Sequence, residues 1–364
     1  MALTEIENGM LTDGILTASK LNTTGTASST TVLKGDFSWG AGASSSGKWN
    51  TADSAPGTPV AGDVWYTGGI IYIAVDTDNT TGAWSTGGNL NTARFSAMGG
   101  GTQNAGLTAG GQSEMASTEE YNGNVWTTVN NIAGGGRSWV PGNGTQTSAW
   151  LGGGGPAPGY DTSETYDGTC WSAANDMLAT HYVSSGSGTA TAGLIVSGRV
   201  GGTQFSPSCE EFDGTSWTAA GSVSTGRNES SSTGPQSTTL CCGGENSSSG
   251  GYLQSSEEYN GTSWSAGGTN GSTGRKSAGI AGTTSAAIYA GGGHDPGGLA
   301  LADQYDGTTW SVIPPLFEAI SSKPVGAGSS TAGLLSGGYG SAALANTEEW
   351  NYVGAFNAKM VGYT

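Results

Sequence analysis

Charge is scarce in this 364-residue chain, and positive charge is scarcer than negative charge. Lysine and arginine together number 11, aspartate and glutamate 28, and histidine 2, which gives a formal net charge of -17 at pH 7. Proteins that bind nucleic acid neutralise phosphates with a clustered basic surface. The charge balance therefore predicts no nucleic-acid partner, and it favours a protein that stays soluble and unassociated.

Long apolar runs and paired cysteines are missing as well. No stretch approaches the roughly 18 consecutive apolar residues of a transmembrane helix, so we expect no membrane insertion. The opening residues MALTEIENGM lack the basic region and the apolar core of a signal peptide. No two cysteines form a CxxC motif, so we interpret them as small buried hydrophobic side chains, with a disulfide or a metal site as the alternative. They are Cys170, Cys209, Cys241 and Cys242.

Glycine is abundant. It accounts for 67 of 364 residues, against about 7% in an average protein, and it follows no collagen period. The 12 tryptophans and 13 tyrosines argue against disorder. Composition therefore predicts a folded, turn-rich β protein with a surface of serine, threonine, asparagine and glycine.

One phrase recurs along the chain. Residues 255–264 read SSEEYNGTSW: two acids, an aromatic residue, Asn-Gly, two small residues and a tryptophan. Asn-Gly or Asp-Gly between such runs predicts a β-hairpin. Related phrases lie at residues 117–126, 163–171, 210–217 and 303–310, and a truncated one, NTEEWN, lies at residues 346–351.

Each phrase belongs to a longer repeat. An apolar strand ending in a glycine pair comes first, then a variable loop, the acidic-aromatic strand, the turn and the tryptophan strand. The tryptophans at positions 84, 126, 171, 217, 264 and 310 are spaced by 42, 45, 46, 47 and 46 residues. Four short strands per repeat of roughly 45 residues predict the blade of a β-propeller.

The glycine pair, the acid-aromatic-Asn/Asp-Gly phrase, the tryptophan and a following arginine resemble the kelch repeat over about residues 84–351. One blade departs from the pattern, because Ser197-Gly198 replaces its glycine pair. The resemblance implies an all-β fold, a six-bladed kelch-like β-propeller.

The last blade ends in NTEEWN without a tryptophan strand of its own, so we expect the Trp84 strand to close it. The rival count is seven blades, the seventh built from residues 63–84 and the C-terminal FNAKMVGY.

A cation recurs sixteen residues before the first glycine of the pair in most blades: Arg94, Arg227, Arg275 and His181, which precedes Ser197. Arg137 lies fifteen residues before Gly152, and the sixth place falls at Ser321. A ring of free cations would suit sulfated or uronic sugars. The kelch resemblance instead implies structural pairs that lock neighbouring blades through forked guanidinium–carboxylate contacts, with partners among Glu120, Glu164, Glu211, Glu258 and Glu349.

The variable loops hold the candidate ligand-binding residues. The tryptophans occupy one fixed place per blade, as core residues do, whereas loops are where binding function concentrates. The candidates are Tyr160, Phe205, Tyr252, His294 and Asp295.

We predict no catalytic residue, no cofactor and no metal site. Residues 76–79, DTDN, have the spacing of a calcium loop but no downstream bidentate glutamate, so a turn is favoured. EEFDGTSW lacks the residue that separates Asp from Gly in a sialidase Asp-box, and two histidines are too few for a copper oxidase on a kelch scaffold.

Residues 1–62 differ from the rest of the chain. They carry no repeat, and we interpret them as a mostly extended attachment arm and linker that gains order from a partner, with a plain disordered tail as the alternative. The propeller domain is then residues 63–364. NGMLTDGILTASKL followed by GTASSTTVLKGDFSWG resembles linker and attachment segments of bacteriophage tail-fibre proteins, and GDVWYTGGIIYI is similar to short modules in the same proteins.

This second resemblance implies a non-enzymatic phage virion protein, a tail fibre or similar appendage that displays its propeller for host-surface glycan recognition. The arm would bind other virion proteins, and the assembly would be a homotrimer on the viral particle. Two alternatives remain open: a structural capsid decoration or tail-wall protein, and a polysaccharide-degrading enzyme.

Overall fold

The computed structural model describes residues 82–157, 159–247, 251–271, 273–294, 297–322 and 324–352, together with five short strands nearer the N-terminus. The chain divides into two units, Gly82–Tyr352 and the residues on either side of it. No helix in the described part of the chain is long and apolar enough to cross a membrane. Most of the arm expected at residues 1–62 lies outside the described residues, as does the DTDN segment.

The flanking unit contains two small sheets. In one, β1 pairs with β2. In the other, β4 and β5 form the antiparallel hairpin expected around residues 68–69, and β3 pairs with β4 in parallel. The strands are β1 (Thr31–Leu33), β2 (Trp39–Ala41), β3 (Trp49–Asn50), β4 (Val64–Thr67) and β5 (Ile70–Ile73).

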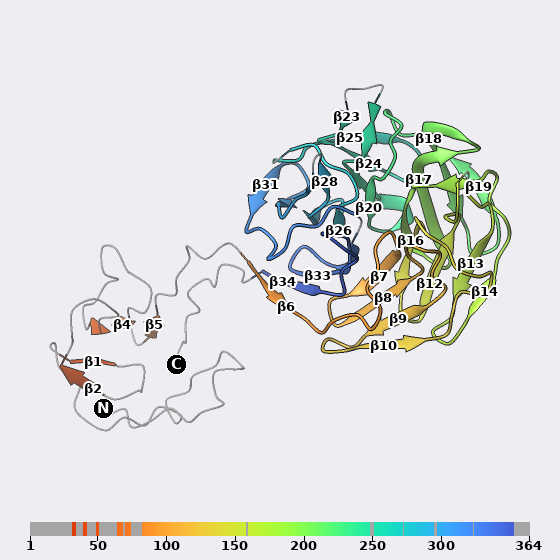
Figure 1. Cartoon of the computed structure of the whole chain (residues 1–364). Helices are drawn as coiled ribbons and strands as arrows, with labels where there is room; N and C mark the ends of the chain where they lie inside the picture. Colours follow the sequence, from red (N-terminus) through yellow and green to blue (C-terminus); the bar gives the residue numbers. More distant parts are fainter. Residues whose placement is uncertain are drawn as a thin grey trace. The chain divides into compact units, whose positions relative to one another are not determined.

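Six antiparallel sheets, five of four strands and one of five, follow one another around a ring, so the fold is the expected six-bladed β-propeller (Figure 1). In blade 1 the strands run outward from the axis as β7 (Met98–Thr102), β8 (Ala105–Ala109), β9 (Thr118–Tyr121) and β10 (Trp126–Val129). Blade 2 contains β11 (Gly142–Thr145), β12 (Ser148–Gly152), β13 (Ser163–Tyr166) and β14 (Trp171–Ala173). Blade 3 contains β16 (Ser185–Thr189), β17 (Ala192–Val200), β18 (Thr203–Phe212) and β19 (Trp217–Ala220), and the short β15 (His181–Tyr182) also pairs with β17.

The other three blades follow the same plan. Blade 4 contains β20 (Ser231–Thr233), β21 (Leu240–Cys242), β24 (Ser255–Tyr259) and β25 (Trp264–Thr269), with a 3-10 turn at Gln236–Thr238. Blade 5 contains β26 (Gly279–Thr283), β27 (Ala286–Ala290), β30 (Ala302–Tyr305) and β31 (Trp310–Ile313). Blade 6 contains β32 (Val325–Gly328), β33 (Ala332–Ser336), β34 (Thr347–Asn351) and β6 (Ala83–Thr86). Two small hairpins sit in loops: β22 (Glu245–Asn246) with β23 (Gly251–Tyr252), and β28 (Gly293–His294) with β29 (Gly297–Gly298).

The ring is closed by strands from opposite ends of the propeller. β6, which carries Trp84, pairs with β34 so that Trp84 lies opposite Trp350, and their ring centroids are 5.3 Å apart. Figure 1 shows the orange β6 beside the blue β34. Because β6 completes the sixth sheet, blade 6 is not left with the open edge that invites aggregation.

The innermost strands meet at the axis almost without a gap. A cavity of about 40 Å³ remains there, lined by small residues of all six blades. A Cβ atom added at Gly186 would lie 2.5 Å from the nitrogen of Gly142, and one added at Gly326 would lie 2.2 Å from the oxygen of Ile280. The axis therefore has room for isolated waters but not for a sugar ring.

The repeated tryptophans belong to the packing between blades. Trp126, Trp171 and Trp217 are buried, and each packs on the aromatic residue that ends the neighbouring strand. Their indole nitrogens donate to a side-chain oxygen of the preceding blade, as Trp171 Nε1 does to Thr118 Oγ1 at 2.8 Å. Where that acceptor is replaced by Cys209, Trp264 donates instead to the backbone oxygen of Gly221.

The cysteines are free thiols. Cys209, Cys241 and Cys242 are buried and Cys170 is exposed. Burial raises the pKa of the Cys209 thiol to about 12. Three of the four therefore fill the core as small hydrophobic groups, as the sequence predicts, and their raised pKa values make them poor nucleophiles.

Candidate functional site

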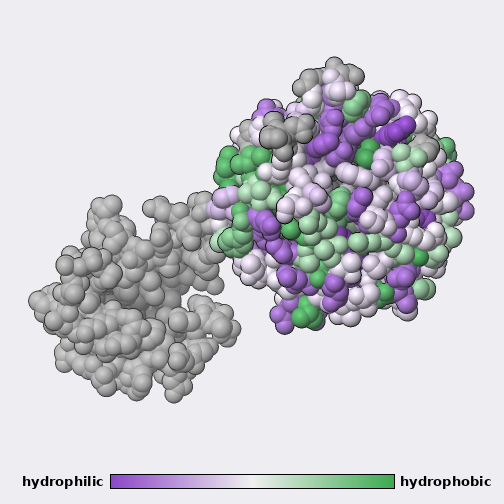
Figure 2. All heavy atoms as spheres, in the orientation of Figure 1, coloured by the Kyte–Doolittle hydropathy of each residue, from purple (hydrophilic) through white to green (hydrophobic). Residues whose placement is uncertain are grey.

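The two ends of the ring carry different kinds of loop. At one end lie the tight Asn-Gly and Asp-Gly turns between the third and fourth strands of blades 1 to 5. At the other end lie the variable loops between the second and third strands, together with the loops that enter each blade; we call this end the loop face. Figure 2 shows hydrophilic and hydrophobic residues interspersed over the visible side of the propeller.

A layer of ion pairs lies buried beneath the loop face. Arg227 and Arg275 are fully buried, which supports the structural interpretation and removes the ring of free cations. Each pair joins the loop entering a blade to the third strand of that blade. The arginine pairs are Arg94–Glu119, Arg137–Glu164, Arg227–Glu257 and Arg275–Asp303, at 2.5, 2.9, 2.5 and 2.7 Å. In blade 3, His181 Nε2 lies 3.0 Å from Glu210 in the same position.

Two details of the predicted pairing are wrong. Glu164 was named correctly, but in blades 1, 3 and 4 the partner is the first acid of the phrase and not the second: Glu119 replaces Glu120, for example. In blade 6 Glu349 has no cation to meet, because Ser321 occupies that place. Adjacent residues of a strand point to opposite faces, so only one of the two acids can meet the arginine. The pairs also lie within a blade and do not lock neighbouring blades together.

The second acids join neighbouring blades through tyrosine hydroxyl groups. Tyr166 of blade 2 donates to Glu120 of blade 1 at 2.8 Å. The same bond links Tyr259 to Glu211, Tyr305 to Glu258 and Tyr121 to Glu349, at 2.9, 2.6 and 2.6 Å.

The two junctions without this bond lack both partners. Blade 2 has Thr165 in place of the acid, and the next blade has Phe212 in place of the tyrosine. Blade 5 has Gln304 in place of the acid, and the next blade has Trp350. A tyrosine hydroxyl group therefore occurs at this position only where the preceding blade offers a carboxylate, as expected for a polar group that is costly to bury without a partner.

The glycine pair sets the start of each variable loop. Its members have positive φ angles, for example 64° at Gly243 and 99° at Gly244. In blade 2 the first of the pair is Gly153, sixteen residues after Arg137, and not Gly152. Ser197 adopts the same conformation at φ 53° in blade 3. The Ser197 hydroxyl accepts a bond from the backbone nitrogen of Arg227 at 2.8 Å and donates to the backbone oxygen of Ser206, contacts that help to hold a residue in this unfavourable region.

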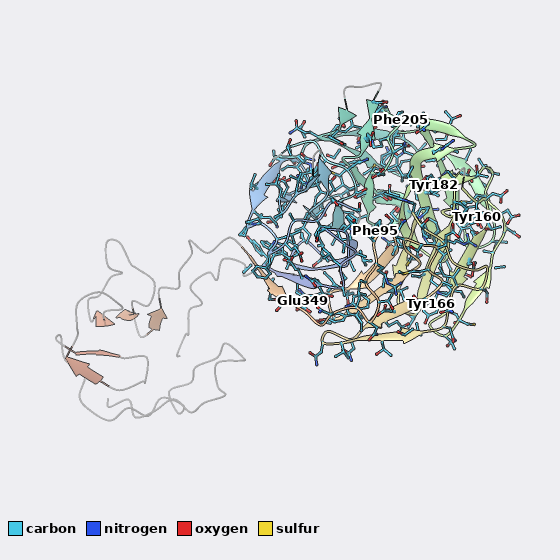
Figure 3. All side chains as sticks on the ribbon, viewed as in Figure 1. Phe95, Tyr160, Tyr166, Tyr182, Phe205 and Glu349 are labelled. Carbon is cyan, nitrogen blue, oxygen red and sulfur yellow. The ribbon has the colours of Figure 1, made fainter. Side chains whose placement is uncertain are left out.

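The structure describes three of the five predicted ligand-binding residues in full. Tyr160 is 39% exposed, and the Arg137 guanidinium lies 5.6 Å from the centre of its ring. Phe205 is half-buried near the tip of the β17–β18 hairpin, and Tyr252 lines an open groove with Leu253. Figure 3 shows Tyr160 and Phe205 on different blades. They are not gathered into one site.

The other two predicted residues cannot be placed in a site. His294 belongs to β28, where it pairs with Gly297, and its side chain lies outside the described part of the structure. Asp295 lies outside the described residues.

Four aromatic residues that the sequence analysis did not single out lie on the loop face. Phe95, Trp139 and Tyr182 come from loops that enter blades 1, 2 and 3, and Tyr339 comes from the variable loop of blade 6. The rings of Phe95 and Tyr339 are 5.1 Å apart, and those of Trp139 and Tyr182 are 6.5 Å apart. Figure 3 shows Phe95 and Tyr182 closer to the centre of the ring than Tyr160.

The signal that could have found these aromatic residues is their position next to the repeated cation. The residue two places after the cation has a positive φ in five blades: 57° at Ser96, 54° at Trp139, 51° at Val183, 56° at Glu229 and 55° at Ser277. The shared conformation belongs to the fold. Trp139 is the only ring among these five side chains, so its identity is not explained by the repeat.

A second, charged cluster lies at blades 4 and 5. Lys276 contacts Glu229 at 3.2 Å and Glu245 at 2.6 Å, and its Nζ lies 5.9 Å from the centre of the Tyr252 ring. Burial raises the pKa of Tyr182, Glu229 raises it further, and Arg199 lowers it. The loop face thus has an aromatic half over blades 6, 1, 2 and 3 and a charged half over blades 4 and 5.

Comparisons with known proteins extend to the fold only. No protein-family model matches the chain, and no curated protein matches it. Among solved structures, one described as "Structure of YjhT" is similar with a TM-score of 0.61 and 13% sequence identity, covering 75% of this chain and 98% of that chain. At this identity the similarity supports the propeller architecture, and function has to be argued from the loop face.

Proposed function

We propose that this chain is a non-enzymatic virion protein of a bacteriophage, a tail fibre or similar appendage whose propeller recognises a glycan on the host surface. The observation that carries the proposal is the aromatic half of the loop face. Aromatic side chains offer large apolar surfaces with a polar edge, which suits the apolar faces and hydroxyl groups of a sugar.

The location of the aromatic residues supports binding over packing. Tyr160 and Tyr339 are 39% and 36% exposed, whereas the repeated tryptophans of blades 1 to 3 are at most 5% exposed. Rings that lie in unrepeated loops and stay partly exposed contribute little to the core. Loops of this kind on a rigid scaffold are where binding residues concentrate.

The state of the acids supports recognition over hydrolysis. A glycosidase uses two carboxyl groups on either side of the scissile bond. Beneath the loop face, the described acids Glu119, Glu164 and Glu257 are buried and held by arginine. Glu229 and Glu245 are held by Lys276. Such engaged carboxylates suit a scaffold better than acid–base catalysis.

The attachment role rests on the resemblance of residues 5–75 to linker and attachment segments of phage tail fibres. In this proposal the N-terminal segment binds other virion proteins, the protein assembles as a homotrimer, and the propeller remains accessible to the host.

A glycan array probed with the purified full-length chain tests recognition. We expect binding to host surface polysaccharide, loss of binding in Trp139→Ala/Tyr182→Ala, and unchanged binding in Val125→Ala, whose side chain is 49% exposed in the Asn-Gly turn of blade 1, at the end of the ring opposite the loop face. Release of reducing ends from the polysaccharide would replace the proposal with a depolymerase. Labelling of the chain on intact virions, seen by electron microscopy along the capsid instead of on the tail, would replace it with a capsid decoration protein.

A further inference from the structure

One arginine stands apart from the other basic residues. The part of the chain with described side chains contains six lysines and arginines, and Arg94, Arg137, Arg227, Arg275 and Lys276 each contact a carboxylate. Arg199 forms no ion pair with any described residue, and its buried Nε has no hydrogen-bond partner among them. A half-buried guanidinium without an acid is a candidate for an external anion.

The strand register places Arg199 on the same face of the sheet as Tyr182. In blade 3, Tyr182 of β15 lies directly opposite Arg199 of β17, and the next pair along is His181 with Val200. His181 and Val200 are 0% and 8% exposed. Because successive residues of a strand alternate between faces, Tyr182 and Arg199 share the opposite, more accessible face, where cross-strand Cβ atoms lie about 5 Å apart.

Trp139 packs beside this pair. Its ring lies edge-on to that of Tyr182, with centroids 6.5 Å apart. Its backbone has a φ of 54°, a conformation that disfavours large side chains. Two rings and a guanidinium therefore come together from the segments that enter blades 2 and 3 and from the end of β17, next to the tip of the β17–β18 hairpin.

The acid that acts on Tyr182 is already engaged. Glu229 raises the pKa of Tyr182 while Arg199 lowers it, so both charges lie near the phenol. Glu229 contacts Lys276 Nζ at 3.2 Å and accepts a hydrogen bond from Ser277 Oγ at 2.5 Å. Glu229 therefore interacts with the loop that enters blade 5. The charge of Arg199 remains available beside Trp139 and Tyr182.

We propose that Arg199, Tyr182 and Trp139 form a subsite for an anionic sugar, a uronic acid or a sulfated residue of the recognised glycan. The forked guanidinium binds the carboxylate or sulfate through paired hydrogen bonds. The two rings contact the sugar, and the Tyr182 hydroxyl group bonds a sugar hydroxyl. The subsite rests on the proposed glycan recognition and specifies the class of glycan.

Titrations of the full-length protein with glucuronate, glucose 6-sulfate and glucose, followed by ligand-observed NMR at low salt, test the subsite. We expect the two anionic sugars to bind at least about tenfold more tightly than glucose, the range of a hydrogen bond to a charged group, and their binding to weaken with added salt. Glucuronate and the sulfate separate the two possible anions.

Three variants separate the charge from the rings. Arg199→Gln should abolish the preference for anionic sugars while leaving glucose binding unchanged, and Arg199→Lys should retain part of it because it keeps the charge without the fork. Trp139→Ala should weaken binding of all three sugars. Val125→Ala, at the end of the ring opposite the loop face, is the control and should bind like the parent chain.

Equal affinity for glucose and the anionic sugars, no binding of any of the three, or an unchanged preference in Arg199→Gln would overturn the subsite. In each case the glycan array reports separately on the proposed function. If the array shows glycan binding that does not change in Arg199→Gln, glycan recognition stands and the anionic subsite is wrong. If the array shows no binding, both proposals are wrong.

Discussion

Blades 4 and 6 carry the same acid in two different settings. Glu257 in blade 4 accepts the Arg227 guanidinium at 2.5 Å and the backbone nitrogen of Ser224 at 2.7 Å. Glu348 in blade 6 accepts the backbone nitrogen of Phe317 at 2.9 Å, and Ser321 stands where the other blades have a cation. Both acids are buried, at 4% and 5% exposed.

The comparison separates two tasks that the repeat combines. The carboxylate accepts a backbone N–H of the loop that enters its blade, a bond present in blades 1, 2, 3, 4 and 6. The cation neutralises that buried charge and also holds backbone oxygens, as Arg227 does with Gly243 and Ser255. In blade 6, burial without a cation raises the pKa of Glu348.

The largest effect is expected from Arg227→Ala. Removing one partner of a buried pair leaves the other charge uncompensated, at a cost of about 3–5 kcal/mol, measured as the free energy of unfolding in urea. The double variant Arg227→Met/Glu257→Leu, which removes both charges, should lose less than the single one. If Arg227→Ala lowers the free energy of unfolding by less than about 1 kcal/mol, the range of a surface ion pair, the pair is not buried as described.

A smaller effect is expected at the junction between blades 1 and 2. Tyr166→Phe removes a hydrogen bond to a carboxylate, 2.8 Å long, and should lower the free energy of unfolding by about 1.5 kcal/mol. Phe212→Tyr is the matched control, because its junction offers Thr165 instead of an acid, and it should bring no gain. If the added hydroxyl stabilises the chain as much as Tyr166 does, the matching of tyrosine with glutamate has no energetic basis.

Glu348→Gln should increase stability at neutral pH by less than about 1 kcal/mol, by an amount that depends on pH. The pKa of Glu348 is higher in the folded chain than its ordinary value because of burial, so the folded state takes up this proton first as the pH falls. The charged form therefore costs stability at neutral pH, and the cost is lost as the pH falls from the folded pKa to the ordinary pKa of the unfolded chain.

Urea unfolding at several pH values should accordingly show the Gln variant more stable than the parent chain at pH 7, with the difference shrinking as the pH falls below the folded pKa of Glu348 and gone below the ordinary pKa of a glutamate. A variant that is less stable at pH 7 would mean that the carboxylate anchors the loop more strongly than its burial opposes it.

Arg199→Gln should have the smallest effect on stability, within about 0.5 kcal/mol, as for a substitution away from the core. Arg227 then supports the fold, whereas Arg199 is available for a ligand. Thermal unfolding of the two variants side by side measures the difference. A loss of several degrees in Arg199→Gln would assign that arginine to the scaffold.

The number of blades and the positions of the hairpins could be predicted because they depend on local signals that repeat. Each Asn-Gly or Asp-Gly turn, with its aromatic and tryptophan neighbours, specifies a hairpin without help from the rest of the chain. The burial of Trp126 or Trp171 was predictable for the same reason, since a large side chain at one fixed place per blade must pack against the same kind of neighbour.

The candidate site was less accessible to prediction. Tyr160 was correctly assigned to a variable loop, whereas Phe205 belongs to the long strand β18. Trp139 and Tyr182 were missed because they follow a repeated cation and look like part of the repeat. No sequence pattern marks Arg199. It stands out because no carboxylate pairs with it, and which acids lie close to it depends on distances across the loop face.

The sequence by itself determined the period, the turns, the core tryptophans and the pairing of a cation with an acid in most blades. The tertiary structure decided which of two adjacent acids meets the arginine and which meets the tyrosine of the next blade. Those choices depend on the face toward which each side chain points and on what the neighbouring blade presents there. The same holds for the loop face, where residues distant in sequence become neighbours only when the ring closes through β6 and β34.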